Sequence, residues 1–155
     1  MPTITIHTYI KAQPNIVFDL ARSIELHIAS AASTKEKAVG GTTSGLMGLN
    51  DQVTWNALHL GVFQNFTSRI TAMNSPHSFT DTMIKGTFAS FQHDHFFEPK
   101  ENGTLMTDKI NFSSPLGILG KWFDKAYLTD YLIRFINQRN QIIKKVAERE
   151  VRNLS

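Results

Sequence analysis

The stretch FQHDHFF, residues 91–97, places two histidines two positions apart, with an aspartate between them and phenylalanines around them. Residues i and i+2 of a strand share a face, so His93 and His95 are predicted to lie with Phe91 on one face. Asp94 is predicted to lie on the opposite face. Imidazoles in such positions can bind a metal ion, transfer protons or anchor a ligand. The pattern therefore leaves several kinds of chemistry open.

The next predicted strand carries an acidic partner for these histidines. A turn over PKENG, residues 99–103, would place His95 near Met106 and His93 near Asp108. A buried pair of His93 and Asp108 is therefore expected. Such a pair can be a self-satisfied polar cluster, because a buried polar group needs a partner.

A metal site would need a third ligand beyond the two histidines. Asp94 is on the wrong face, and Asp108 or His59 could serve only in a strongly curved sheet, so no metal is predicted. In a second interpretation, an imidazole held by Asp108 acts as a general acid or base. In a third, the imidazoles line a cavity and give an apolar ligand something to bond. We favour the cavity-facing interpretation.

Two other catalytic or cofactor signatures are missing from the sequence. A serine nucleophile of the G-x-S-x-G type does not occur. The glycine-rich residues 40–48, GGTTSGLMG, lack the spacing that cradles phosphates and are predicted to form a loop between strands near a pocket mouth. No cofactor is therefore predicted.

The remaining candidate ligand contacts are mostly aromatic, and each could also be ordinary core. They are Trp55, His59, Phe63, Phe79, Tyr127, Tyr131 and Phe135. Trp55 and His59 share a face of their predicted strand. Arg69 and Asp81 lie in neighbouring predicted strands and could form an ion pair, to which we assign a structural role.

The elements that must position these residues follow from periodicity. The expected order is a strand, two short helices, six strands in series and one long amphipathic helix: residues 3–10, 12–23, 24–33, six strands between 35 and 112, and 120–151. Six strands without an intervening helix favour an antiparallel meander. The fold class is predicted to be α+β, with a curved sheet of about seven strands wrapped around the long helix.

Composition narrows the class of protein. A chain of 155 residues that is 41% hydrophobic is predicted to form a single domain, residues 1–155. Absence of cysteine excludes disulfides, and the amino terminus has no signal-peptide pattern, so a cytoplasmic protein is expected. The apolar runs are too short for a membrane span. Residues 121–155 hold eight Lys/Arg and four Asp/Glu, a pattern typical of a solvated helix face and not of nucleic-acid binding.

The element order resembles the helix-grip fold of the START/Bet v 1-like (SRPBCC) superfamily, and the motifs resemble its bacterial polyketide cyclase/dehydrase-like branch. The matching stretches are PNIVFDLARSIELH, AVGGTTSGLMGLNDQVTWNALHLG, FTSRIT, FTDTMIKGTFASFQHDHFF and GTLMTDKINFSSPLG. The resemblance implies binding of a small hydrophobic molecule or lipid between the sheet and the last helix. The alternatives are a cyclase or dehydratase that uses His93 or His95 with Asp108, and an interaction domain with a filled interior.

Overall fold

The computed structural model of the chain describes residues 2–59, 61–114 and 127–154. The elements follow the order expected from periodicity: β1 (Thr3–Ile10), α1 (Pro14–Ala21), α2 (Ile24–Ser30), the 3-10 helix η1 (Ala32–Thr34), β2 (Lys37–Gly41), β3 (Gln52–His59), β4 (Val62–Asn74), β5 (Ser78–Lys85), β6 (Ser90–Lys100), β7 (Gly103–Ser113) and α4 (Thr129–Leu154). The α+β prediction is confirmed.

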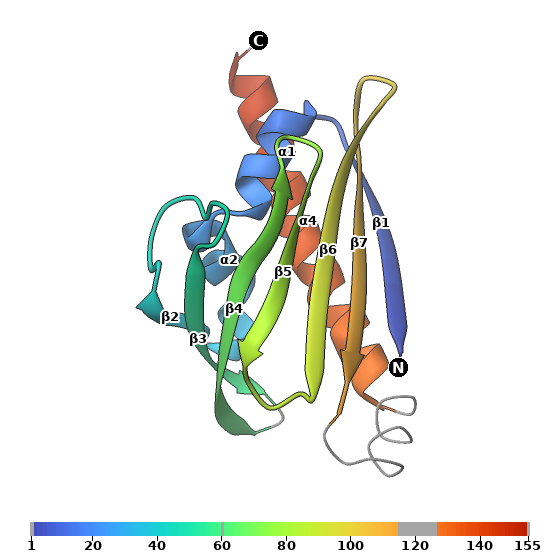
Figure 1. The fold of residues 1–155 in the computed structure, drawn as a ribbon. Helices are drawn as coiled ribbons and strands as arrows, with labels where there is room; N and C mark the ends of the chain where they lie inside the picture. Colours follow the sequence, from blue (N-terminus) through green and yellow to red (C-terminus); the bar gives the residue numbers. More distant parts are fainter. Residues whose placement is uncertain (1, 60, 115–126, 155) are drawn as a thin grey trace.

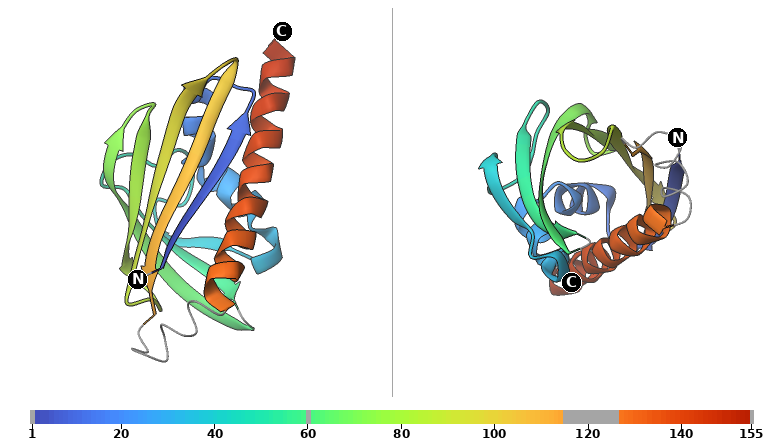
Figure 2. Two further views of the ribbon diagram at one scale, coloured as in Figure 1. Left: turned by 90° about the vertical axis from the view of Figure 1, so that its right-hand side faces the viewer. Right: turned by 90° about the horizontal axis from the view of Figure 1, so that it is seen from below.

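All seven strands form one antiparallel sheet in the order β1-β7-β6-β5-β4-β3-β2. The strands from β2 to β7 are joined in series, and β1 pairs with β7 at one edge (Figure 1). Figure 2 shows the sheet curving around α1 and α2, with α4 lying along its open side. The concave face of the sheet and the three helices therefore surround a common interior, as the helix-grip prediction requires.

Alternation along the strands decides which side chains enter this interior. In β1, Ile4, Ile6 and Ile10 are buried while Thr3 and Thr5 are exposed. This period of two is what a strand with one face on the core requires. The two faces of β1 are the ones predicted from the sequence.

The two short helices begin where the sequence indicates. Pro14 stands in the first turn of α1, where its missing N–H removes no helical hydrogen bond. Ser23 caps α2 by accepting a hydrogen bond from the backbone N–H of Leu26 at 3.2 Å. The two helices therefore begin at residues that favour a helix start, and they close one end of the curved sheet.

The helix α4 buries one line of side chains against the sheet, formed by Leu132, Ile136, Ile143 and Ala147 together with two polar residues considered below. The spacing of three and four is that of an amphipathic helix. The predicted start of this helix, from residue 120 to residue 126, lies outside the described residues. None of the described helices is long and apolar enough to cross a membrane.

The hairpin between β6 and β7 corrects the predicted register. Its loop contains only Glu101 and Asn102, so β6 continues through Pro99 to Lys100 instead of ending before a five-residue turn. Glu101 supplies the positive φ of 53° that the tight turn needs. As a result, His95 lies opposite Asp108, and the predicted register is wrong by two residues.

Gly41, at the end of β2, is required both for its positive φ and because a Cβ would not fit there. The two effects can be separated by experiment. Gly41 has φ of +70°, and a Cβ there would collide with the carbonyl oxygen of Gln52. Gly45 has a similar φ of +80° in open space. A left-handed backbone costs an ordinary residue about 1–2 kcal/mol, and a clash with a strand carbonyl adds to it.

We therefore expect Gly41→Ala to lower the free energy of unfolding by about 3 kcal/mol or more, and Gly45→Ala by about 1 kcal/mol. Urea denaturation of both variants measures the difference. Equal losses in the two variants would contradict the proposed contact between residue 41 and Gln52.

Candidate functional site

The two histidines of β6 point into the interior, as their spacing predicts. His93 and His95 are buried, with 5% and 2% of their surface exposed, while the adjacent Gln92 is exposed. The imidazole rings of the two histidines stack at a centroid distance of 3.7 Å. The ring of His95 also stacks on Phe79 of β5, at 4.1 Å. Three flat side chains therefore form one continuous stack on the inner face of the sheet.

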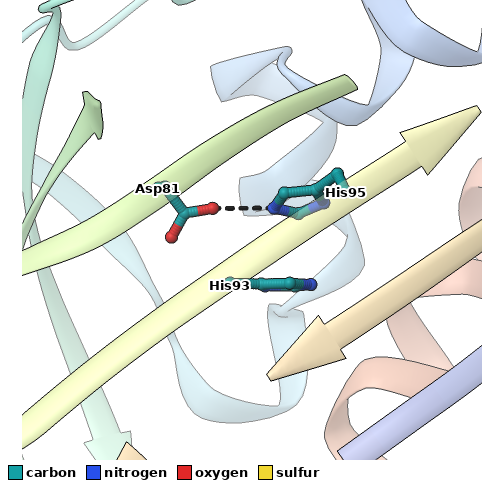
Figure 3. Close-up of side chains that lie close together, drawn as sticks. All are labelled: Asp81, His93 and His95. Carbon is teal, nitrogen blue, oxygen red and sulfur yellow. Dashed lines mark hydrogen bonds and ion pairs between the residues drawn. The ribbon is translucent and has the colours of Figure 1, made fainter. Parts of the chain in front are cut away.

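Each histidine donates a hydrogen bond to a different carboxylate. Nε2 of His93 lies 2.7 Å from Oδ1 of Asp108, and Nε2 of His95 lies 2.7 Å from Oδ2 of Asp81. Figure 3 shows the second pair beside the ring of His93. The predicted pair of His93 and Asp108 is therefore present, although the register places His95 directly opposite Asp108. The bond to His93 is diagonal across the two strands.

Polar residues of α4 hold Asp108 from its other side. Nδ2 of Asn140 donates to Oδ2 of Asp108 at 2.7 Å and also reaches Oγ1 of Thr8 on β1 at 3.3 Å. The guanidinium of Arg139 lies 3.7 Å from Oδ1 of Asp108 and donates to the backbone carbonyl of Ala21 in α1 at 3.1 Å. One carboxylate therefore connects β7 with β1, α1 and α4.

The surroundings of the two imidazoles shift their pKa values in opposite directions. Burial opposes a charge on His93, and the neighbouring charge on His95 adds to this effect, so the pKa of His93 lies below its ordinary value despite the bond to Asp108. Burial also opposes a charge on His95, but the contacts with Asp108 and Asp81 outweigh it and raise the pKa of His95. His95 therefore keeps its proton to a higher pH than His93 does.

The carboxylates are ionised for the complementary reason. Burial by itself would raise the pKa of Asp108, but His93, His95 and Arg139 hold this pKa well below its ordinary value. Burial would also raise the pKa of Asp81, but the bond to His95 and the charges of the neighbouring histidines and Arg139 together lower it. When His95 holds its proton, two negative carboxylates face two positive groups, Arg139 and the imidazolium of His95. The buried cluster is electrically balanced, as a low-dielectric interior requires.

A cavity of about 410 Å³ borders this cluster, between the concave face of the sheet and the helices α1, α2 and α4. Eight of the predicted ligand contacts line it: Trp55, His59, Phe79, Phe91, His93, His95, Tyr131 and Phe135. Most of the other lining residues are apolar, including Val53, Ile70, Leu132 and Ile136. The cavity therefore has an apolar wall with a polar stack on one side.

Three predicted ligand contacts do not line the cavity. Asp108 lies behind His93 and is fully buried. Phe63 is 58% exposed, because it pairs with Leu58 in the outward phase of β3 and β4. Tyr127 is also largely exposed. The phase of β4 explains why Phe63 is exposed. Asp108 affects the cavity only through the imidazole of His93, to which it is bonded.

Two further pairs of polar side chains border the cavity. Nδ1 of His59 lies 2.6 Å from the hydroxyl of Tyr131, which joins the end of β3 to α4. Burial lowers the pKa of His59 and raises that of Tyr131, so it favours the neutral form of both partners. His27 of α2 stacks on Trp55 and bonds Glu36 at 2.9 Å. These pairs satisfy each other and close the wall between the sheet and the helices.

Asp81 is the main residue that the sequence interpretation placed wrongly. It was expected to pair with Arg69, but Arg69 is exposed and bonds Gln52, whereas Asp81 faces inward opposite Ile70. The two residues lie on opposite faces of the sheet. Asp81 is two positions after the inward Phe79, so strand alternation alone could have placed it beside the histidines.

Arg139 and Asn140 were also missed, although their spacing carried a signal. They lie three and four residues after Ile136 and three or four residues before Ile143, on the buried line of α4. Their polar types concealed that position, because such residues are usually exposed. His27 and Glu36, outside any clear motif, had no comparable signal.

Asp81 supplies the third potential metal ligand that the sequence did not reveal. Among the residues that the structure describes, Asp81, His93 and His95 form a group whose ligand atoms lie within 4.8 Å of one another. However, Nε2 of His95 and Oδ2 of Asp81 are 2.7 Å apart, closer than the roughly 3.3 Å expected for two ligands in a tetrahedral zinc site. The short distance between His95 and Asp81 fits a shared hydrogen and not a metal ion. The balanced charge of the buried cluster does not attract a further cation.

Solved structures resemble this chain over almost its whole length. The TTHA0849 protein of Thermus thermophilus superposes with a TM-score of 0.72 at 16% identity, over 94% of this chain and 99% of that one. The major latex-like protein 151 of Panax ginseng gives 0.70 at 18% identity, over 94% and 97%. A START superfamily protein of Mycobacterium smegmatis gives 0.70 at 12% identity, over 99% of both chains.

No family model matches this chain, and no curated protein matches it by sequence. The structural likeness nevertheless spans both chains in each comparison. At these identities it establishes the fold and nothing finer. The fold is therefore that of the START/Bet v 1-like proteins, as the motifs predicted.

We expect the two stacked histidines to titrate separately. His95 should retain its proton above pH 6.5, while His93 stays neutral with hydrogen on Nε2. A raised pKa in the folded state stabilises the protein fully below pH 6.5, and this contribution is lost as the pH rises through the pKa of folded His95. The loss amounts to about 1.4 kcal/mol for each unit by which that pKa is raised.

Long-range 1H–15N NMR spectra of the imidazoles between pH 5 and 9 would measure both protonation states. The variant Asp81→Asn serves as a control, because it should lower the pKa of His95 without breaking the bond between His93 and Asp108. A spectrum in which His93 holds the charge at pH 7 would contradict the assignment.

Proposed function

We propose that this chain binds a small apolar molecule or lipid in the cavity between the curved sheet and α4. The observation that carries the proposal is the cavity itself, about 410 Å³ with a largely aromatic and aliphatic wall. Small-molecule pockets usually measure 300–1,000 Å³ and combine apolar walls with a few polar groups. The START/Bet v 1-like fold, in which a sheet grips a helix, supports the same proposal.

The open interior supports ligand binding more than a filled interaction domain. A protein core is normally packed without voids larger than a water molecule. Here Phe79, Phe91 and Phe135 border open space instead of filling it. An apolar ligand that covers the apolar surface of the cavity removes this surface from water, which stabilises the complex.

A second candidate function is acid–base catalysis on a polyketide-like substrate, as in the cyclase or dehydratase alternative. One observation favours it: a neutral His93, held by Asp108, borders the cavity beside the protonated His95. A base and an acid with separated pKa values are what such chemistry uses. Turnover that is lost in His93→Ala, in a protein that still folds, would be its signature.

Filling the cavity tests the binding proposal. Ala57 of β3 is buried and lines the cavity, so Ala57→Trp should occupy much of its volume. We expect the variant to weaken binding of the neutral fluorescent probe N-phenyl-1-naphthylamine at least about tenfold, a loss of about 1.4 kcal/mol. Ala72→Trp, at an exposed position of β4, is the matched control and should bind like the wild type.

Native mass spectrometry of the freshly purified protein complements this experiment by detecting any molecule that remains bound. Absence of probe binding in the wild type, or equal binding in both tryptophan variants, would argue against a ligand cavity. Thermal unfolding of the variants shows whether a lost signal reflects a lost fold.

A further inference from the structure

One ring nitrogen of His93 has no hydrogen-bond partner among the described residues. Nε2 of His93 is bonded to Asp108, and no other hydrogen bond of His93 is found among the described residues. Its Nδ1 is therefore free. His59 and His27, which also line the cavity, are likewise bonded through one ring nitrogen each, to Tyr131 and to Glu36. His93 differs from them because it is buried and stacked on His95.

The hydrogen bond to Asp108 decides what the free nitrogen can do. An ionised carboxylate can only accept, so Nε2 of His93 must carry a hydrogen. A second positive charge would lie 3.7 Å from the charged ring of His95 in a buried stack, and this arrangement is unfavourable. The lowered pKa of His93 agrees with this argument. Nδ1 therefore presents a lone pair and acts as an acceptor.

The free nitrogen can be reached from the cavity. Among the described residues, Nδ1 of His95 is the fully buried side-chain nitrogen or oxygen without a well-formed hydrogen bond, although it lies 3.4 Å from Oδ1 of Asp108. Nδ1 of His93 also lacks a partner among these residues, and the side chain of His93 is 7% exposed. The ring of His93 itself lines the cavity. A ligand in the cavity can therefore approach this acceptor.

The charge balance of the cluster restricts the ligand further. The carboxylates of Asp81 and Asp108 are already matched by Arg139 and the imidazolium of His95. A charged ligand group would meet no uncompensated partner and would lose its hydration. A neutral donor loses little hydration and satisfies the lone pair. A hydroxyl group meets both conditions.

We propose that the cavity selects apolar molecules that carry a hydroxyl group, such as phenols and apolar alcohols, and that this group donates its hydrogen to Nδ1 of His93. The inference rests on the proposed ligand-binding function and specifies the ligand class for the same cavity. Phe79 and Phe91, which also line the cavity, provide aromatic surface for the apolar part of such a molecule.

A pair of ligands that differ only in the donor tests this inference. 1-Naphthol carries the hydroxyl, and 1-methoxynaphthalene has the same ring system without a donor. Equilibrium dialysis of the full chain, freed of bound lipid, gives a dissociation constant for each at pH 7.5. We expect wild-type protein to bind 1-naphthol about tenfold more tightly, because a ligand without the donor leaves a buried acceptor unpaired.

Two variants locate the effect at His93. In His93→Phe the preference for 1-naphthol should fall to about one, because the acceptor is gone while an aromatic ring remains. Ser68→Ala is the matched control, since Ser68 is a buried polar residue of the cavity wall outside the cluster. This control should keep the preference. If His93→Phe does not fold, the 15N chemical shift of Nδ1 of His93 in the wild type, with and without 1-naphthol, decides instead, and an unchanged shift on binding overturns the assignment.

The outcomes separate this inference from the proposed function. Binding of both compounds with equal affinity would overturn the hydroxyl preference and leave the ligand cavity supported. A preference that persists in His93→Phe, or that disappears in Ser68→Ala, would also overturn the assignment to His93. If neither compound binds and the fluorescent probe does not bind either, the ligand-binding proposal itself fails.

Discussion

The ionised carboxylate of Asp108 is the constraint on which the interior depends. A buried charge is tolerated only where hydrogen bonds and opposite charges replace water, and here His93, Asn140 and Arg139 provide them. These partners come from β6 and α4, and Asn140 and Arg139 also contact β1 and α1. The hydrogen bonds and opposite charges that Asp108 requires therefore fix how α4 lies against the sheet.

The same constraint shapes the cavity. Because Asp108 and Asp81 engage the Nε2 atoms of the two histidines, the imidazoles are held in one stacked orientation along the wall. The cluster is balanced in charge, so the cavity contains polarity without net charge. Aromatic residues such as Phe79 and Phe91 complete the wall. An apolar volume with a few fixed polar groups is suited to selecting a small molecule by one hydrogen bond.

Much of this arrangement could be predicted because strands and helices have simple periods. The inward positions of His93 and His95 follow from alternation, and Asp81 could have been placed by the same rule from Phe79. The register of β6 and β7 could not, because it depends on whether the turn holds two residues or five. Asp108 and His93 still met, since a diagonal neighbour lies within reach of an imidazole.

The sequence by itself determined the order of elements and the inward faces of strands such as β1 and β6, because these depend on local propensity and on the period of apolar residues. The resemblance of its motifs indicated the helix-grip fold. Only the tertiary structure decided that Asp81 joins His95, that Arg139 and Asn140 hold Asp108, and that a cavity remains. These features join residues far apart in the chain. Pairwise distances, packing and charge compensation arise only when the sheet has curved around α4.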